Sequence, residues 1–316
     1  MKKLIRRIIQ TMPGFAALDR FLCYRYTGEY QPYRFPHGHF YSPIPYLEDV
    51  KDRAETLFCK DVNLGPSIAL RADEQRSLFT ELARYGGDFH GPDRPTPQYR
   101  YHLEQRSFGR ADGLLLFSML RHFRPRRVIE IGSGFSSALM LDTNERFLDH
   151  SIGFTFIEPF PKRLDSLLSD KDREQCRIVR DRVQAVPLST FAELEAGDML
   201  FVDSSHVSKI GSDVNYIVFD VLPVLVPGVI VHFHDIYWPF EYPQHRILEG
   251  CAWNEDYVLR AFLQYNDVFE IMIFNSYLRA MHADFVQRAL PEGVERSGSS
   301  LWMRKKDDVW TVQPEH

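Results

Sequence analysis

The sequence predicts an α/β protein whose core is a doubly wound, mostly parallel β-sheet. Short apolar runs alternate with segments of helical periodicity over residues 110–236, as expected for parallel strands joined by right-handed crossovers. The apolar runs are continuous, which is typical of strands buried on both faces. The predicted strands are residues 127–131, 152–158, 177–180, 198–203, 228–234, 268–274 and 300–304.

Helices are predicted where apolar residues recur at helical spacing. In the main domain, residues 110–316, they cover residues 111–123, 137–147, 162–168, 212–225, 254–265 and 277–289. Residues 1–109 are rich in aromatic residues and proline, and proline is incompatible with regular helix interiors. We expect this part to form a helical and irregular cap or lid, with helices near residues 47–59 and 72–85.

The composition is that of an ordinary globular protein. The 316 residues are 44% hydrophobic and carry a net charge of -5, so no basic excess indicates nucleic acid as a partner. The four cysteines form no CxxC pair, and we expect reduced thiols in a cytoplasmic protein. No apolar run approaches the roughly 20 residues that cross a bilayer, so no transmembrane segment is expected. The basic and apolar segment 1–10 predicts the start of a helix or, alternatively, a weak contact with a membrane surface.

A glycine-rich turn follows the first predicted strand, where residues 128–137 read VIEIGSGFSS. Gly132 and Gly134 have no Cβ, so they tolerate positive φ and let a ligand approach the backbone closely. Ser137 replaces the third glycine of the dinucleotide-binding fingerprint, which disfavours a nicotinamide cofactor. Glu130 precedes Gly132 by two residues and suits a cationic ligand better than a pyrophosphate. Glu158, at the end of the next strand, is either an acceptor for two ribose hydroxyls or a solvated acid.

Two further strand ends carry polar clusters, at residues 203–206 (DSSH) and 232–235 (HFHD). Open α/β sheets bind ligands at the carboxyl ends of their strands. Alternation along a strand puts the second cluster's two histidines, His232 and His234, on one face. We therefore expect Asp203, His234 and Asp235 to converge.

Taken together, these motifs resemble the class I S-adenosylmethionine (SAM)-dependent methyltransferases, and more specifically the bacterial subgroup described as methyltransferase domain 24. The resemblance covers about residues 110–305 and rests on the EIGSGFSS turn, Glu158 and the two polar strand ends. It implies a Rossmann-like, seven-stranded sheet whose last strand, near residues 299–302, runs antiparallel to the others. It also implies SAM as the cofactor.

The resemblance implies a role for each residue of the cofactor site. The two glycines would pass close to the methionine part and ribose, Glu130 would order the loop or hold the ammonium group, and Glu158 would hold the ribose. Val183 and Gln184 fall where the family flanks adenine. The full set expected at the cofactor is Glu130, Gly132, Ser133, Gly134, Ser136, Ser137, Glu158, Val183, Gln184 and Asp203.

The same resemblance suggests the catalytic groups. In catechol-type O-methyltransferases, an acid at this strand end binds a divalent cation and a lysine three residues later acts as base. Here Asp203 matches the acid, and His206 falls at the position of the base. We expect His206, Asp203 and Asp235 to be catalytic, and Asp203, His234 and Asp235 to be ligands of Mg, Mn or Fe. The alternatives are that His206 caps a helix or only supports the groups that contact ligands, and that Asp235 caps a turn or positions the substrate.

The expected function is O-methylation of a sugar, a glycan precursor or a small natural product, with nitrogen and carbon acceptors as alternatives. A hydroxyl nucleophile must lose its proton, which His206 or a bound metal would accept. One alternative is a non-methylating, metal-dependent enzyme of the cephalosporin hydroxylase type, and another is a non-catalytic SAM-binding protein. The aromatic segments 236–243 and 37–46 are expected to pack as loops or to cover the mouth of the site.

Overall fold

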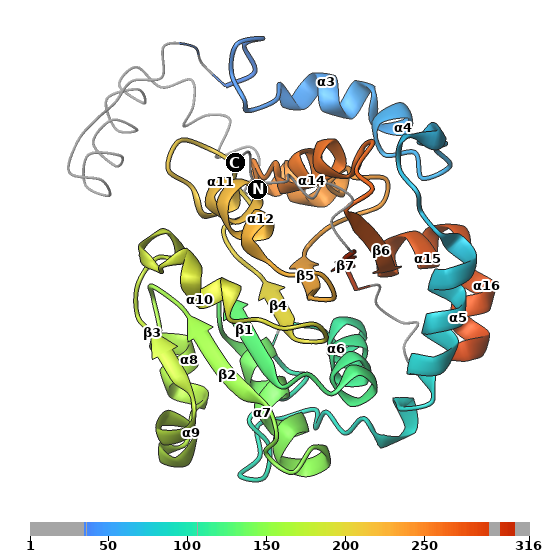
Figure 1. Ribbon diagram of the computed structural model, residues 1–316. Coiled ribbons are helices and arrows are strands. Elements are labelled where there is room, and N and C mark those ends of the chain that lie inside the picture. The colour runs from blue at the N-terminus through green and yellow to red at the C-terminus, as the bar shows by residue number, and fades with distance from the viewer. Residues whose placement is uncertain (1–34, 36, 106, 291–297, 307–316) are drawn as a thin grey trace, which may run out of the picture. The chain divides into compact units, whose positions relative to one another are not determined.

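The computed structural model describes residues 35, 37–105, 107–290 and 298–306 (Figure 1). The chain divides into two compact units, Met1–Asp52 and Arg53–His316. In the first unit, helix α3 spans Leu47–Asp52. The helix start and membrane contact predicted for residues 1–10 lie outside the described residues. The division into a cap of residues 1–109 and a domain of residues 110–316 stays a prediction.

Within the described residues, the second unit is built on one seven-stranded sheet with the order β3-β2-β1-β4-β5-β7-β6. Neighbouring strands from β3 to β5 pair in parallel, whereas β7 is antiparallel to both β5 and β6. This confirms the predicted mostly parallel, Rossmann-like sheet with an antiparallel last strand. The strands are β1 (Arg127–Ile131), β2 (Gly153–Ile157), β3 (Arg177–Val179), β4 (Met199–Val202), β5 (Ile230–His234), β6 (Phe269–Phe274) and β7 (Ser300–Lys305).

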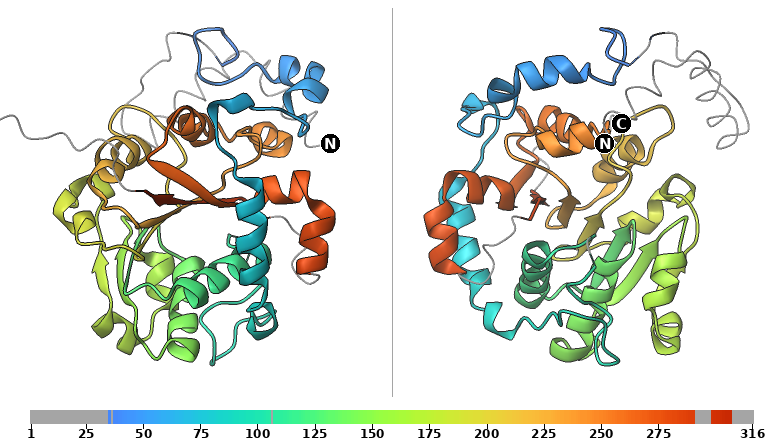
Figure 2. Two further views of the ribbon diagram at one scale, coloured as in Figure 1. Left: turned by 45° about the vertical axis from the view of Figure 1, so that its right-hand side comes forward. Right: turned by 180° about the vertical axis from the view of Figure 1, so that it is seen from behind.

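Helices lie on both sides of this sheet, α6 and α7 on one side and α12 and α14 on the other (Figures 1 and 2). Their apolar faces and the strands form one continuous hydrophobic core. The α-helices described in this unit are α4 (Ala54–Leu57), α5 (Ala72–Ala83), α6 (Arg110–Phe123), α7 (Phe135–Phe147), α8 (Lys162–Leu167), α9 (Asp170–Gln175), α10 (Leu188–Ala192), α11 (Asp213–Tyr216), α12 (Leu222–Val224), α13 (Gln244–Glu249), α14 (Glu255–Leu263), α15 (Asn275–Met281) and α16 (Ala283–Ala289).

Three predicted helices are interrupted in the structure. The helix predicted over residues 47–59 breaks at Arg53, and the one over residues 277–289 begins at Asn275 and breaks at His282. The helix predicted over residues 212–225 contains a π-helical turn, residues 217–221. Pro223 follows this turn and has no N–H to donate to the carbonyl four residues back, so the backbone adopts wider hydrogen bonding there. Helices α9, α10 and α13 are not among the predicted helices.

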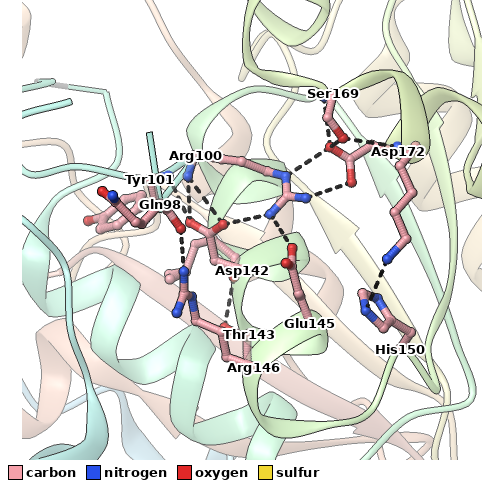
Figure 3. Close-up of polar contacts among 12 residues, drawn as sticks. Gln98, Arg100, Tyr101, Asp142, Thr143, Glu145, Arg146, His150, Ser169 and Asp172 are labelled. Carbon is pink, nitrogen blue, oxygen red and sulfur yellow. Dashed lines mark hydrogen bonds and ion pairs between the residues drawn. The ribbon is translucent and has the colours of Figure 1, made fainter. Parts of the chain in front are cut away.

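Arg100 ties the segment before α6 to two helices (Figure 3). Its guanidinium donates hydrogen bonds to the carboxylates of Asp142 and Glu145 of α7, each at 2.8 Å. It also donates two hydrogen bonds, both at 2.8 Å, to the two carboxylate oxygens of Asp172 of α9. The backbone N–H groups of Arg100 and Tyr101 also donate to Asp142. The side chains of Asp142 and Asp172 are only 4% and 6% exposed, so water cannot stabilise their negative charges and the positive charge of Arg100 does so instead.

We expect Arg100→Met to lower the free energy of unfolding by about 3–5 kcal/mol, because it leaves two buried carboxylates without their cation. Chemical denaturation at pH 7 measures this loss. Arg126→Met is the matched control, since Arg126 is 81% exposed and pairs with Glu195 at 3.5 Å. That variant should change stability by less than about 1 kcal/mol. Equal losses in the two variants would contradict a special role for Arg100.

Candidate functional site

The glycine turn after β1 is held against the end of β4. Gly132 has a φ of 81°, a conformation that favours glycine. A Cβ at Gly132 would overlap the carbonyl oxygen of Asp203, so the two strand ends approach as closely as backbone atoms allow. Gly134 lies at the start of α7, where its N–H donates to the Ser137 hydroxyl at 2.9 Å.

Glu130 lies beneath this turn and is completely buried. The hydroxyl of Ser136 donates to one carboxylate oxygen at 2.5 Å, and that of Ser137 donates to the other. Burial raises the pKa of Glu130 to about 8, against the hydrogen bonds from the serines, which lower it. Of the two roles predicted for Glu130, this geometry favours ordering the loop.

Glu158 follows β2 and faces the same turn. Its carboxylate accepts hydrogen bonds from the backbone N–H groups of Ser133, at 3.1 Å, and Phe160, at 2.7 Å. These bonds orient the carboxylate toward a pocket of about 200 Å³ between the glycine turn, Glu158, Arg163 and Asp203. A second hollow shares Ser133, Glu158 and Arg163 and extends the pocket along α8.

His206 lies beyond the end of β4, between two carboxylates. Its Nδ1 is 2.8 Å from Glu255 Oε2, and its Nε2 is 3.5 Å from Asp203 Oδ1. Glu255 is completely buried, whereas the Asp203 side chain is 28% exposed and borders the pocket. The carbonyl oxygen of His206 also accepts the backbone N–H of Asn254 at 3.0 Å, which fixes this loop to the start of α14.

The electrostatics of His206 follow from these partners. Burial by itself lowers the pKa of an imidazole, but the hydrogen bonds and charges of Asp203 and Glu255 outweigh it. They hold the pKa of His206 well above its ordinary value. The imidazole therefore has a high affinity for a proton, and Glu255 fixes the orientation of the ring through Nδ1.

Asp235 belongs to a separate hydrogen-bond network at the end of β5. Its Oδ1 accepts from the Tyr237 hydroxyl at 2.7 Å and the Ser299 hydroxyl at 2.8 Å, and Arg246 lies 3.7 Å from Oδ2. Burial raises the pKa of Asp235, but the charges of nearby histidines and these hydrogen bonds outweigh it and lower the pKa overall. Asp235 thus remains a carboxylate that is already surrounded by donors.

His234 is buried against the Phe108 ring, with 5.1 Å between ring centroids. Burial lowers its pKa, but the charges of Asp203, Asp112 and Asp235 outweigh burial and raise it. Asp203 and Asp235 thus act electrostatically on His234, and the convergence of the three side chains stays a prediction. In the part of the chain that the structure describes, however, no group of three His, Cys, Asp or Glu side chains is arranged to hold a metal ion. The predicted metal ligands do not fit a metal as they stand, because Asp235 is bound by Tyr237 and Ser299, and they stay a prediction.

Three other predicted residues, His232, Val183 and Gln184, contact parts of the protein outside the pocket. His232 and His234 lie on one face as predicted, 5.7 Å apart, but His232 stacks on Phe201 at 3.7 Å inside the core. Val183 is buried, and the Gln184 amide donates to the Gly211 carbonyl at 2.8 Å. Neither lines the pocket among the residues described there, and their adenine contact stays a prediction.

The aromatic loop after Asp235 is part of the core. Its side chains at Ile236, Trp238, Phe240 and Tyr242 are all buried, and Trp238 contacts the Tyr277 ring with 4.8 Å between centroids. These contacts support the packing alternative for residues 236–243. In the other unit, the similar segment 37–46 leaves Phe40, Tyr41 and Tyr46 exposed.

The chain is similar to several known proteins. A family model described as a methyltransferase domain matches residues 129–236. An uncharacterised protein of Archaeoglobus fulgidus is 35% identical over 166 residues, which cover 51% of this chain and 74% of that protein. The SAH-bound methyltransferase PaMTH1 of Podospora anserina is 16% identical with a TM-score of 0.42, covering 84% of this chain and 99% of that one. The O-methyltransferase TomG of Streptomyces achromogenes, in complex with SAM, is 14% identical with a TM-score of 0.38, covering 82% and 96%.

The chain belongs to this methyltransferase-domain family, and the predicted class, a SAM-dependent methyltransferase, is confirmed. The matched segment runs from β1 through the turn after β5, so it contains the glycine turn, Glu158, Asp203 and Asp235. Among the described helices, none is long and apolar enough to cross a bilayer.

The residues of the pocket fit SAM. The hydroxyl of Ser204 is buried there without a hydrogen-bond partner in the described structure. The carboxylates of Glu158 and Asp203 supply the acceptors that hydroxyl and ammonium groups require.

Sequence reasoning missed two residues of the site. Glu255 directly follows Asn254 at the start of α14, where an acid is expected merely for its interaction with the helix dipole. Arg163 lies within α8, and nothing in the sequence connects it with the pocket. Both become recognisable only when distant segments are brought together.

We expect Glu130→Gln to remove part of the dependence of stability on pH. The folded-state pKa of Glu130, about 8, lies above the value near 4.5 of an unperturbed glutamate, so the folded protein binds an extra proton between these pH values. The wild type therefore loses stability as the pH rises from 5 to 8, and the neutral amide should flatten this decline. Denaturant unfolding at several pH values measures it, with the exposed Glu249→Gln as control. Parallel curves for wild type and Glu130→Gln would contradict the assignment.

Proposed function

We propose that this methyltransferase acts on a hydroxyl oxygen and that His206 accepts the proton of that hydroxyl. The observation that carries the proposal is the position of the His206 ring, held by the buried Glu255 on one side and facing Asp203, at the border of the pocket, on the other. A histidine oriented in this way by a carboxylate is a typical general base.

The proposed cofactor contacts follow from the donors and acceptors in the pocket. Glu158, already oriented by two backbone N–H groups, would accept the ribose hydroxyls. The glycine turn would lie along the methionine part, where Gly132 leaves space, and Asp203 would attract the cationic end. Glu130 supports the turn from below through Ser136 and Ser137.

SAM, when bound, supplies a methyl group that the sulfonium has already activated for displacement. The contribution of the protein is then mainly alignment, which reaches effective molarities of about 10⁵–10⁸ M in favourable intramolecular models. Nε2 of His206, when the ring is neutral, would accept the proton of the acceptor hydroxyl while the methyl carbon leaves the sulfonium sulfur and bonds to the acceptor oxygen. Because Asp203 and Glu255 raise the pKa of His206, this neutral form is populated at higher pH than for an ordinary histidine. Glu255 stabilises the resulting imidazolium through Nδ1, and Asp203 contributes a second negative charge nearby.

For the acceptor we propose a sugar, a glycan precursor or a small natural product, by analogy with the family. Asp235 would act as a positioning residue near the acceptor, since Tyr237 and Ser299 fix its carboxylate. A divalent metal at Asp203, His234 and Asp235 stays a prediction, and no step of the proposed reaction depends on it.

We expect SAM and its demethylated product, but not NAD, to raise the melting temperature of the protein. A ligand at about 100 times its Kd stabilises the folded state by about 2.7 kcal/mol. Glu158→Ala should weaken SAM binding by roughly 10–100-fold, the loss expected for charge-assisted hydrogen bonds to the ribose. The exposed Glu174→Ala is the control, and titration calorimetry measures both. Unchanged affinity in Glu158→Ala would remove Glu158 from the cofactor site.

We expect His206→Asn to lower kcat by roughly 10²–10⁴-fold without weakening SAM binding, because a general base contributes about this much. The measurement is transfer of the labelled methyl group of SAM, first to a panel of sugars, glycans and phenols, and then to the best acceptor. Glu255→Gln keeps the shape of Glu255 and should lower kcat by less than His206→Asn does, with KM nearly unchanged. Full activity in His206→Asn, or transfer only to nitrogen acceptors, would overturn the proposal.

A further inference from the structure

A separate apolar pocket, about 230 Å³ in volume, lies among α5, α6, α15 and α16. Its walls are mostly hydrocarbon. They include Phe79 and Leu82 of α5, Leu114 and Leu115 of α6, and Val286 and Leu290 at α16. Among the described residues, it shares no lining residue with the pocket at the glycine turn.

Helix α16 covers this pocket without filling it. The helix lies beside α5 at the outer side of the unit (Figures 1 and 2), and the Phe285 ring contacts the Phe79 ring with 5.9 Å between centroids. An amphipathic helix normally buries its apolar face. Nevertheless, none of the residues of α16 is fully buried, and Phe285, Val286 and Ala289 are only partly so. The apolar face of α16 therefore borders space that a ligand can occupy.

One charged group lines the apolar pocket. Arg279 of α15 has its Nη1 atom buried, with no hydrogen-bond partner anywhere in the described chain. A buried guanidinium nitrogen that lacks an acceptor is unfavourable, and carboxylates and phosphates are the acceptors that match its geometry. Hydrocarbon walls together with one guanidinium nitrogen that lacks an acceptor are complementary to an amphipathic anion.

We propose that this pocket binds an amphipathic anion, with a hydrocarbon chain between α5, α6 and α16 and a carboxylate or phosphate on Arg279. This binding site goes beyond the proposed function, because none of the groups assigned to methyl transfer lines it. The two sites are nevertheless connected. Gly298 lines the pocket, and the next residue, Ser299, donates its hydroxyl to Asp235.

The test uses the full chain and four ten-carbon probes below their micelle-forming concentrations. Calorimetry should show that decanoate binds, that decanol binds at least about 10-fold more weakly, and that decylammonium does not bind detectably. Decyl phosphate distinguishes a phosphate from a carboxylate as the preferred head group. Equal affinities for decanoate and decanol, or no binding of either, would overturn the proposal.

Two variants locate the site. Arg279→Gln should lower the affinity for decanoate about 10-fold, to that for decanol. The affinity for decanol should not change. Val286→Trp should fill the pocket and abolish the binding of both probes. The exposed Arg288→Gln on the same helix is the control and should bind like the wild type. Unchanged decanoate binding in Arg279→Gln would refute the role of the guanidinium.

A thermal shift with SAM in each variant separates this proposal from the preceding one. A variant that has lost decanoate but keeps its SAM shift is folded and has lost only the second site. If decanoate binds the wild type and SAM does not, the proposed function fails while the amphipathic-anion site stands. If SAM binds the wild type and decanoate does not, the amphipathic-anion site fails while the proposed function stands.

Discussion

The close approach of β1 and β4 at their carboxyl ends is the constraint on which the rest of the site depends. Because the two strands are paired in register, the residue after β1 meets the residue after β4, and only a glycine fits at position 132 against the Asp203 carbonyl. The glycine turn and the loop that carries Asp203 and His206 consequently form two sides of one pocket. Any side chain at Gly132 would separate these two sides.

Buried charge is the second organising feature. Asp112, His206, His234, Asp235 and Glu255 are largely removed from water, and a buried charge is tolerated only when it is paired or hydrogen-bonded. The protein meets this requirement with two separate arrangements, one around His206 and one around Asp235. Each holds its side chains in fixed orientations before any ligand arrives, and such preorganisation is what a transfer reaction with an already activated methyl group needs.

The strand end that carries Asp235 also connects the site with the helices at the edge of the sheet. Asp112 of α6 accepts the Ser299 N–H and the Asn275 amide, each at 3.0 Å, and both partners adjoin the apolar pocket or the Asp235 network. A ligand that packs against α6 and α15 therefore contacts the same framework that positions Asp235. The apolar pocket and the Asp235 network therefore border one hydrogen-bond framework.

The sequence by itself determined the sheet, its mostly parallel order and the cofactor turn. Buried parallel strands appear as continuous apolar runs, and the glycine turn is a local requirement that neighbouring residues in the chain reveal. The partners of the functional side chains were decided only by the tertiary structure. Glu255 contacts His206 across 49 residues of sequence, and Ser299 contacts Asp235 across 64. No local sequence pattern therefore predicts either contact. The same holds for the Arg279 pocket, because burial and the lack of an acceptor are properties of packed helices and not of any one segment.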